Sequence, residues 1–479
     1  MRYRFAFIVL ISALLPNFIQ AAPAQGLAIT DPQTLRELDH GDLGLGRMLA
    51  ASRNAPLTNE ALFALPAMTV VRRAFDAEFA RYIDRHYATR PRETIGVGAS
   101  HDVQLFDPSL LIASDTRFVL AGIVNRMDRA YVAPESCGEV RLIYRLTRTG
   151  EGAPSRLPMT LNLVLRARQP GDAMGCADFA RGWLLSDAPL ATLTPDHIDR
   201  LETNLQIAHA PQSATREFRT DYLQKVFHRD ATSGAFVEAA MENQIDRDRL
   251  LADADLARSF KAWLLMPDHL AAFDAGTVVI PEEFLATSSV ASTPAGLARS
   301  SLQPSFGLMQ SDHAGGNAVF SDGDVVAALA KAAARGVVLQ NIHSPAGFAR
   351  RLGDSGCGGC HQVRGIGGFH FPGVDAASPV TVAASPHFNG DQPRRRDILV
   401  ALRDGVAPDF SRGFSDRPQA RRSTGLAGTA MLDGWGATCY RPQPIDNDAS
   451  FAAWNCAEGL SCQPVGADMA SRFGMCFVQ

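Results

Sequence analysis

The stretches VRLIYRL at residues 140–146 and MTLNLVL at residues 159–165 decide the fold of the N-terminal half of this chain. In both, large apolar side chains alternate with side chains that are mostly polar. A period of two is typical of half-buried antiparallel strands. The segment TGEGAP between them, at residues 149–154, has the composition of a loop, so the pattern predicts a β-hairpin.

A hairpin places the residue before its first strand beside the residue after its second strand. Cys137 and Cys176 occupy these two positions. A Cys137–Cys176 disulfide that staples this end of the sheet is therefore the expected pairing. The alternative is two free buried thiols.

The regions around this hairpin are expected to add one more strand and several helices. Residues 118–124 form a mostly apolar run that suits a buried strand. After Pro66, apolar residues recur every four positions, which indicates one face of a helix. Residues 196–272 are expected to be mainly helical, with two apolar stripes at helical spacing. The residues that define these three helical patterns are Val71, Phe75, Phe79 and Ile83, then Phe218, Tyr222, Leu223 and Val226, then Leu256, Phe260, Trp263 and Leu264.

Residues 286–305 favour a linker between two domains. They are rich in Ser, Thr, Ala and Pro and hold a single charge, at Arg299. Three helices are expected beyond this linker. Asp322 caps the first, a short one follows Pro345, and Asp391 caps the third.

Between the second and third of these helices lies the most specific motif of the chain, Cys357-Gly358-Gly359-Cys360-His361. Cys-x-x-Cys-His is the pattern that attaches a c-type haem, because both thiols bond to the porphyrin and the adjacent His is placed to ligate the iron. Glycines between the thiols let the backbone lie close to the ring. The alternatives are a Cys357–Cys360 disulfide and part of a zinc site.

The N-terminus has the pattern of a secretory signal peptide. Arg2 and Arg4 precede an apolar run at residues 5–15, and small residues follow at 20–24. We expect residues 1–22 to be removed and the mature protein to be soluble and exported, periplasmic or secreted. The apolar run is short for a membrane span, although an uncleaved N-terminal anchor is the alternative. Attachment of c-type haem takes place outside the cytoplasm, so signal and motif agree.

The six cysteines outside the motif are an even number, which in an oxidising compartment suggests three disulfides. Four of them, Cys439, Cys456, Cys462 and Cys476, lie in a tail with little regular pattern, which indicates a small disulfide-stapled module. The simplest pairing joins neighbours, Cys439 to Cys456 and Cys462 to Cys476.

The composition of the 479-residue chain is that of a globular protein. Hydrophobic residues make up 46% and charged residues 20%, which is enough apolar material and length for two or more domains. The net charge is −4, so nothing in the charge balance suggests nucleic acid as a partner.

The motif and its flanking helices resemble a mono-haem c-type cytochrome over about residues 315–435. The resemblance implies that Cys357 and Cys360 carry the thioethers of one covalent haem c and that His361 is the proximal iron ligand. It also implies a distal ligand, commonly a Met downstream of the motif. The candidates for this ligand are Met431, His387, His370 and, before the motif, His343.

Residues 394–422 hold eight arginines and four aspartates. One interpretation is contact with haem propionates or docking of an acidic redox partner. The alternative interpretation is a solvated helix face and loop.

These patterns predict an α+β fold. An N-terminal domain with antiparallel sheet plus helices, over 26–285, precedes a mainly helical cytochrome c-like domain over 306–436 and a disulfide-rich module over 437–479. The expected function is electron transfer through the haem, with a redox protein as partner and no membrane span in the mature protein. The alternatives are a haem-dependent peroxidase or oxygenase, and a secreted binding protein whose motif is only a disulfide or metal clip.

Overall fold

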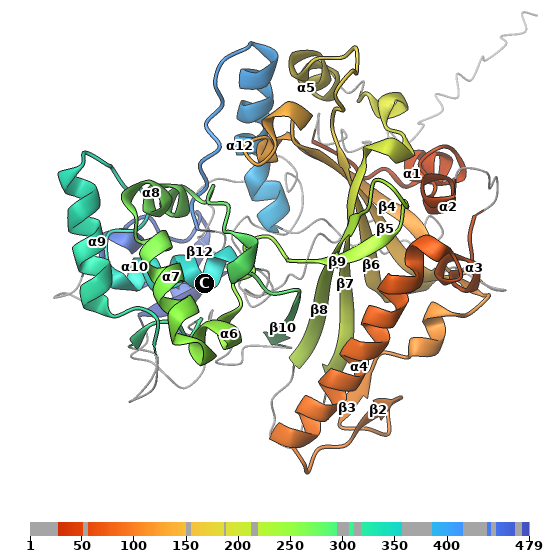
Figure 1. Cartoon of the computed structure of the whole chain (residues 1–479), viewed down its shortest axis with the longest axis horizontal. Coiled ribbons are helices and arrows are strands. Elements are labelled where there is room, and N and C mark those ends of the chain that lie inside the picture. The colour runs from red at the N-terminus through yellow and green to blue at the C-terminus, as the bar shows by residue number, and fades with distance from the viewer. Residues whose placement is uncertain are drawn as a thin grey trace, which may run out of the picture.

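The computed structural model describes residues 27–50, 56–149, 155–185, 188–211, 219–294, 306–310, 318–356, 386–414, 438–441, 447–464 and 472–478. In this part of the chain the largest element is a ten-stranded sheet, in which every pair is antiparallel except β2 with β3. Figure 1 shows the sheet in one half of the molecule and a group of helices in the other. The strands are β1 (Ala28–Ile29), β2 (Ile95–Val97), β3 (Val103–Leu105), β4 (Thr116–Arg126), β5 (Glu139–Arg148), β6 (Ser155–Arg166), β7 (Ile198–Ala210), β8 (Arg219–Arg229), β9 (Phe236–Ala239) and β10 (Ser288–Pro294).

The hairpin expected from the alternating pattern is confirmed. β5 pairs with β6 in antiparallel register, with Leu142 opposite Leu163. The buried run at 118–124 lies in β4, which pairs with the other edge of β5. Cys137 and Cys176 form a disulfide at the end of this hairpin, as predicted.

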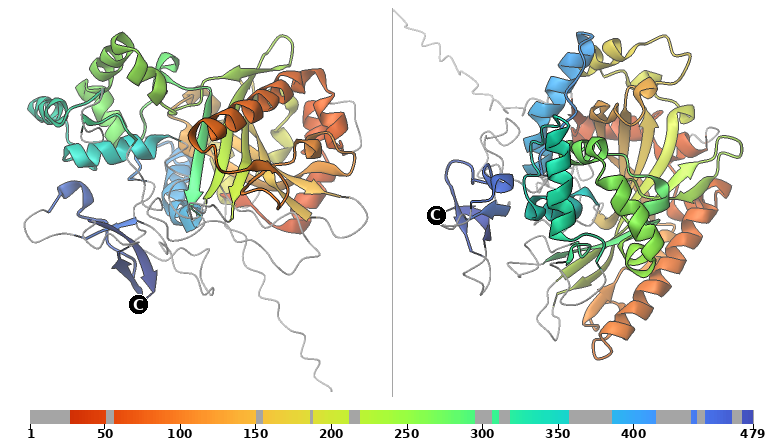
Figure 2. Two further views of the ribbon diagram at one scale, coloured as in Figure 1. Left: turned by 90° about the horizontal axis from the view of Figure 1, so that it is seen from below. Right: turned by 60° about the vertical axis from the view of Figure 1, so that its left-hand side comes forward.

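One face of the sheet is covered by the N-terminal helices. Phe75 and Phe79 of the helix expected after Pro66 are buried in a single apolar core with Leu163 and Leu205 from the sheet. In Figure 2 this long helix, α4, lies across the strands. The helices on this side are α1 (Pro32–His40), α2 (Leu45–Leu49), α3 (Asn59–Phe63) and α4 (Thr69–Thr89).

The prediction that residues 196–272 are mainly helical is wrong for its first half, which forms β7 and β8. The buried face of β8 carries Leu223, Lys225 and Phe227. Because a charged side chain takes one of these buried positions, the apolar alternation that marks a strand is interrupted. The second half is helical and comprises α6 (Arg247–Ala252), α7 (Ala254–Leu264) and α8 (Pro267–Ala275).

The expected mainly helical cytochrome c-like domain over 306–436 is not seen in the described residues, and this part of the fold prediction is wrong. Helices α9 (Asp322–Ala334) and α10 (Pro345–Ser355) pack around one core with α6, α7 and α8. Phe348 of α10, for example, contacts the rings of Phe273 and Phe320. The apolar faces of α9 and α10 are thus buried against residues that precede the linker, in what we call the helical unit (α6–α10).

The remaining elements of this region join the sheet. Residues 288–294, the first part of the expected linker, form β10, which pairs along β8. The last long helix, α12 (Pro386–Arg403), packs against α5 (Cys176–Leu184) and the short 3-10 helix η3 (Met127–Arg129) beside the sheet. Because α12 begins before the expected cap, Asp391 lies in its interior.

The tail forms a small three-stranded sheet with two disulfides. Its strands are β11 (Thr438–Tyr440), β12 (Leu460–Gln463) and β13 (Phe473–Val478), with β13 in the centre. The bonds join Cys439 to Cys462 and Cys456 to Cys476, so the neighbour pairing is wrong.

The register of the tail sheet does not by itself give this pairing, because Cys462 lies directly opposite Cys476 on β13 and yet bonds Cys439. Cys439 lies opposite Gly474 on the central strand, and a Cβ on this glycine would be 3.2 Å from the sulfur of Cys462. The absence of a side chain at Gly474 lets the disulfide pass beside the strand. Order along the chain does not contain this information.

The tail module rests on the helical unit, as Figure 2 shows. The guanidinium of Arg350 on α10 lies over the rings of Trp454 and Phe473. Ser344, which caps α10, donates a hydrogen bond to Asp448 at 2.7 Å. No helix in the described part of the chain is long and apolar enough to cross a membrane.

Candidate functional site

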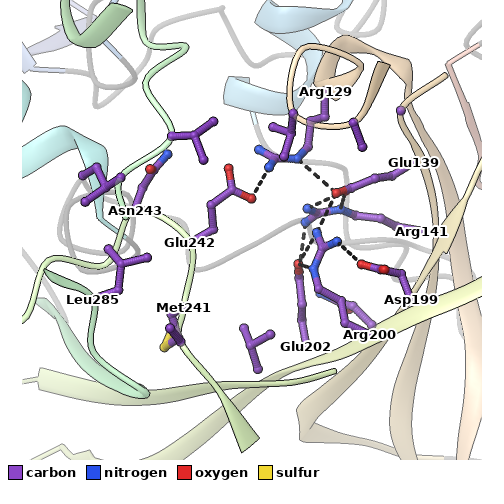
Figure 3. A pocket seen from close by; sticks show the side chains of 18 of the residues that line it. Arg129, Glu139, Arg141, Asp199, Arg200, Glu202, Met241, Glu242, Asn243 and Leu285 are labelled. Atoms are coloured by element: carbon purple, nitrogen blue, oxygen red, sulfur yellow. Dashed lines mark hydrogen bonds and ion pairs between the residues drawn. The ribbon is translucent and has the colours of Figure 1, made fainter. Parts of the chain in front are cut away.

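A cavity of about 750 Å³ lies between the sheet and the helical unit (Figure 3). Strands β5 to β8 supply its floor. Residues 240–243 and 276–285 supply most of its wall, and the C-terminal end of α10 reaches it at Asp354 and Ser355. Its volume is within the range of about 300–1,000 Å³ that small-molecule and cofactor sites occupy.

The floor of the cavity is polar because of the pleat of the strands. In β5, Val140 and Leu142 are buried in the core under the N-terminal helices. Glu139, Arg141 and Arg145 alternate with them and line the cavity on the opposite face. Charged side chains that are withdrawn from water require ionic or hydrogen-bonding partners.

Most of the charged residues in the floor are partnered by one another, as Figure 3 shows. Glu139 accepts hydrogen bonds from Arg129 at 3.3 Å, Arg141 at 3.1 Å and Arg200 at 2.7 Å. Glu202 accepts from Arg141 at 3.0 Å and from Arg200 at 2.9 Å. We call these residues the arginine–carboxylate network. It also includes the residues bonded to it, which are Glu242, Arg126, Asp128, Asp391, Arg394 and Arg395.

The network connects the sheet to two other parts of the fold. Arg129 also donates to Glu242, in the segment that leads from β9 into the helical unit. On the α12 side, Asp128 accepts from Arg126 at 2.9 Å and from Arg394 at 3.0 Å. Asp391 of α12 accepts from Arg394 and Arg395, each at 2.8 Å.

The arginines keep the carboxylates of the network ionised. Burial alone would raise the pKa of Glu139, but the charges of Arg200, Arg129 and Arg141 outweigh it and hold this pKa well below its ordinary range. In the same way, Arg126, Arg395 and Arg394 overcome burial and hold the pKa of Asp128 well below its ordinary range. The pKa values of Glu202 and Asp391 are also lowered, by neighbouring arginines against burial.

These shifts predict loss of stability in acid. A carboxylate whose pKa is lowered by folding contributes stability above its unfolded pKa of about 4, and the contribution is lost as pH falls towards the folded pKa. We expect the free energy of unfolding in urea to fall by at least about 2 kcal/mol between about pH 5 and pH 3. A Glu139→Gln variant, which lacks one such group, should show a shallower decline. An unchanged or rising stability over this range would contradict the prediction.

The residues of the haem motif lie outside the described part of the chain. This holds for Cys357, Cys360 and His361, for the distal candidates His370 and Met431, and for the side chain of His387. The described chain stops at Gly356, directly after α10.

Two sets of sequence candidates are described in full. His343 is exposed at the start of α10, and its ring forms a hydrogen bond with the backbone carbonyl of Gln340. The six other cysteines are all in disulfides. The sulfurs of Cys439, Cys456 and Cys462 lie within 4.8 Å of one another because two disulfides are adjacent there. Oxidised sulfurs of this kind are not the thiolates that bind metal.

The arginine–carboxylate network was not anticipated from the sequence. Arg141 and Arg145 were recognised only as the polar members of an alternating strand. A signal was nevertheless present, because charged residues with the same parity occur at 139, 141 and 145, interrupted by Ile143, and at 200 and 202. Charges at this spacing on paired strands of one sheet share a face.

Comparison with known proteins gives no assignment: no protein-family model, no curated protein and no solved structure matches this chain. What the chain does is therefore inferred from its own residues.

Proposed function

We propose that this chain is an exported redox protein that carries one c-type haem, attached through Cys357 and Cys360 with His361 as proximal ligand, and that it transfers electrons. The observation that carries the proposal is the position of α10. Its last turn lines the cavity with Asp354 and Ser355, and the motif follows after one residue.

The end of α10 is closely packed. Gly356 follows Ser355 and lies against Gln244, since a Cβ on Gly356 would be 2.9 Å from Oε1 of that side chain.

The helix that precedes the motif in the chain is firmly held. Arg351, in its penultimate turn, is 3% exposed and donates to Asp354 at 3.1 Å. It also donates to the backbone carbonyls of Asp274 and Arg412. These bonds tie α10 to α8 and to the segment after α12.

The cavity suits the two chemical parts of a haem. Val278, Ile280 and Leu285 give its wall an apolar surface for a macrocycle. Arg412 lines the cavity, and its guanidinium makes no salt bridge among the described residues. An arginine in this position is suited to a propionate carboxylate. When bound, the haem supplies a one-electron change at iron, and the chain supplies the binding surface and the ligands.

The disulfides support export. Three are present in the described residues, and such bonds form in oxidising compartments, where c-type haem is also attached. This agrees with the signal peptide expected at residues 1–22.

The proposal is tested by exporting the full chain in cells with intact haem-attachment machinery. We expect a red protein whose mass is increased by one haem. Its c-type reduced spectrum should survive acid–acetone extraction. The double variant Cys357→Ser/Cys360→Ser should be colourless with unshifted mass, whereas Ser355→Ala, two residues before the first thiol, should retain the haem. A colourless wild-type protein of unshifted mass would refute haem attachment.

The role in electron transfer has its own test. A haem with a distal ligand from His387, Met431 or His370 should not bind carbon monoxide rapidly when reduced at neutral pH, because both axial positions are filled. The single variants His387→Ala, His370→Ala and Met431→Leu are expected to identify that ligand through a change of spin state in one of them. Rapid carbon monoxide binding by the wild-type protein would replace the carrier role with catalysis at an open iron site.

A further inference from the structure

A row of polar side chains crosses the floor of the cavity at right angles to the strands. Arg145 on β5 is directly opposite Thr160 on β6, Thr160 is opposite Asn204 on β7, and Asn204 is opposite Gln224 on β8. Directly paired residues share a face of the sheet, and all four residues line the cavity. Strands are spaced by about 4.8 Å, so the row extends over about 14 Å. We call these four residues the polar row.

The polar row differs from the arginine–carboxylate network because several of its buried polar atoms have no hydrogen-bond partner among the described residues. The guanidinium of Arg145 makes no salt bridge among the described residues, and its Nε is buried without a hydrogen-bond partner. The side-chain amide oxygens of Asn204 and Gln224 are also buried without a hydrogen-bond partner. So is the amide oxygen of Asn162, two residues after Thr160 on β6. Gln224 is only 6% exposed. Buried polar atoms without partners are costly, and their clustering in a cavity indicates a ligand that completes them.

We propose that the polar row binds a small hydroxycarboxylate, such as a sugar acid. Arg145 would receive the carboxylate, because it is the cation of the floor that lacks a carboxylate partner within the described residues and a guanidinium binds carboxylates in a two-pronged geometry. The carboxamides of Asn204 and Gln224 in the row, and of Asn162 beside it, offer both donors and acceptors, which is the chemistry that hydroxyl groups require.

The charge of the surroundings agrees with an anionic ligand. The carboxylates of Glu139 and Glu202 on the same face are each bonded to two or more arginines. Burial, together with the nearby Arg156, lowers the pKa of Arg145, which is the direction expected for a buried cation without a carboxylate beside it. An anion at this place supplies that negative charge.

The residues of this site are not those that hold the haem in the proposed function. The polar row lies on β5 to β8, and none of its members belongs to the haem motif. The Cys357→Ser/Cys360→Ser protein is therefore expected to bind the same ligand, and the failure of one proposal leaves the other standing.

The test is isothermal titration calorimetry of the full exported chain with D-glucuronate and D-gluconate at low salt. At least one of them should bind, and D-glucose should bind at least about tenfold more weakly because it lacks the carboxylate. Arg145→Gln should weaken binding about 10- to 100-fold, since it removes a charge-assisted hydrogen bond. Arg148→Gln, an exposed arginine on the same strand that pairs with Asp115, should leave binding unchanged.

A second variant keeps the test decisive if Arg145→Gln does not fold. Gln224→Glu is nearly isosteric and places a negative charge in the row, so it should abolish binding of the acid. The proposal is overturned if neither acid binds at about 10 mM, or if glucose binds as tightly as the acids. It is also overturned if Arg145→Gln and Arg148→Gln weaken binding equally.

Discussion

Replacing Glu139 by glutamine is expected to lower the free energy of unfolding by about 3–5 kcal/mol. This side chain is 12% exposed and accepts hydrogen bonds from Arg129, Arg141 and Arg200. Glutamine preserves the shape but removes the negative charge, and its amide nitrogen cannot accept. Three largely buried guanidinium groups then lie close together with less negative charge between them, which is the costly situation for an ion network in the protein interior.

The measurement is urea unfolding of both proteins at pH 7, followed by circular dichroism and tryptophan fluorescence. Glu135→Gln is the matched control, because Glu135 also lines the cavity but is exposed and uses only its backbone carbonyl. Its effect should stay within about 0.5 kcal/mol. A Glu139→Gln variant as stable as the Glu135→Gln variant would mean that the network contributes nothing to the fold.

Local sequence patterns were sufficient where one face of an element is apolar. The hairpin, the Cys137–Cys176 bond and the helix with Phe75 and Phe79 all follow from side chains that repeat at the period of the element. In each, the burial of apolar surface decides the structure, and burial leaves a period that can be read along the chain.

Patterns failed where polar groups are buried or where distant segments meet. The helices after residue 320 have ordinary apolar faces. The sequence around Val325 and Phe348 does not indicate that they belong to one core with Phe260 and Phe273. The cavity arises from the same meeting of segments. Its lining residues are spread along the chain from Arg129 to Arg412, so no short motif could have marked it.

The haem motif and the polar row differ in the same way, because the first is local in the sequence and the second is assembled from separate strands. Cys357, Cys360 and His361 are recognisable because haem attachment requires fixed spacing along the chain. Arg145, Asn204 and Gln224 are neighbours only through strand register, and each alone is an ordinary polar residue of a strand. Sites built across a sheet can be recognised only after the pairing of its strands is known.

The second large effect on the free energy of unfolding is expected from replacing Lys225. This is the charged residue that interrupts the apolar alternation of β8. Its side chain is fully buried, and its Nζ donates to Glu78 of α4 at 3.0 Å and to Glu238 of β9 at 2.6 Å. Lys225→Met should lower the free energy of unfolding by about 3–5 kcal/mol, because Glu78 then remains buried without its lysine. Arg81, which also bonds Glu78, is too exposed to replace the lost charge in full.

A double-mutant cycle separates the lost charge from lost packing. Lys225→Met combined with Glu78→Leu removes both charges and fills the space with apolar atoms, so it should recover at least about 2 kcal/mol of the loss. Lys261→Met is the control for removal of a lysine from a salt bridge, because Lys261 pairs with Asp324 while both side chains are about one-third exposed. Its effect should not exceed about 1 kcal/mol. If the double variant is less stable than Lys225→Met alone, the lysine stabilises the sheet through packing of its stem, and the ion pair with Glu78 is not what holds α4 on β8.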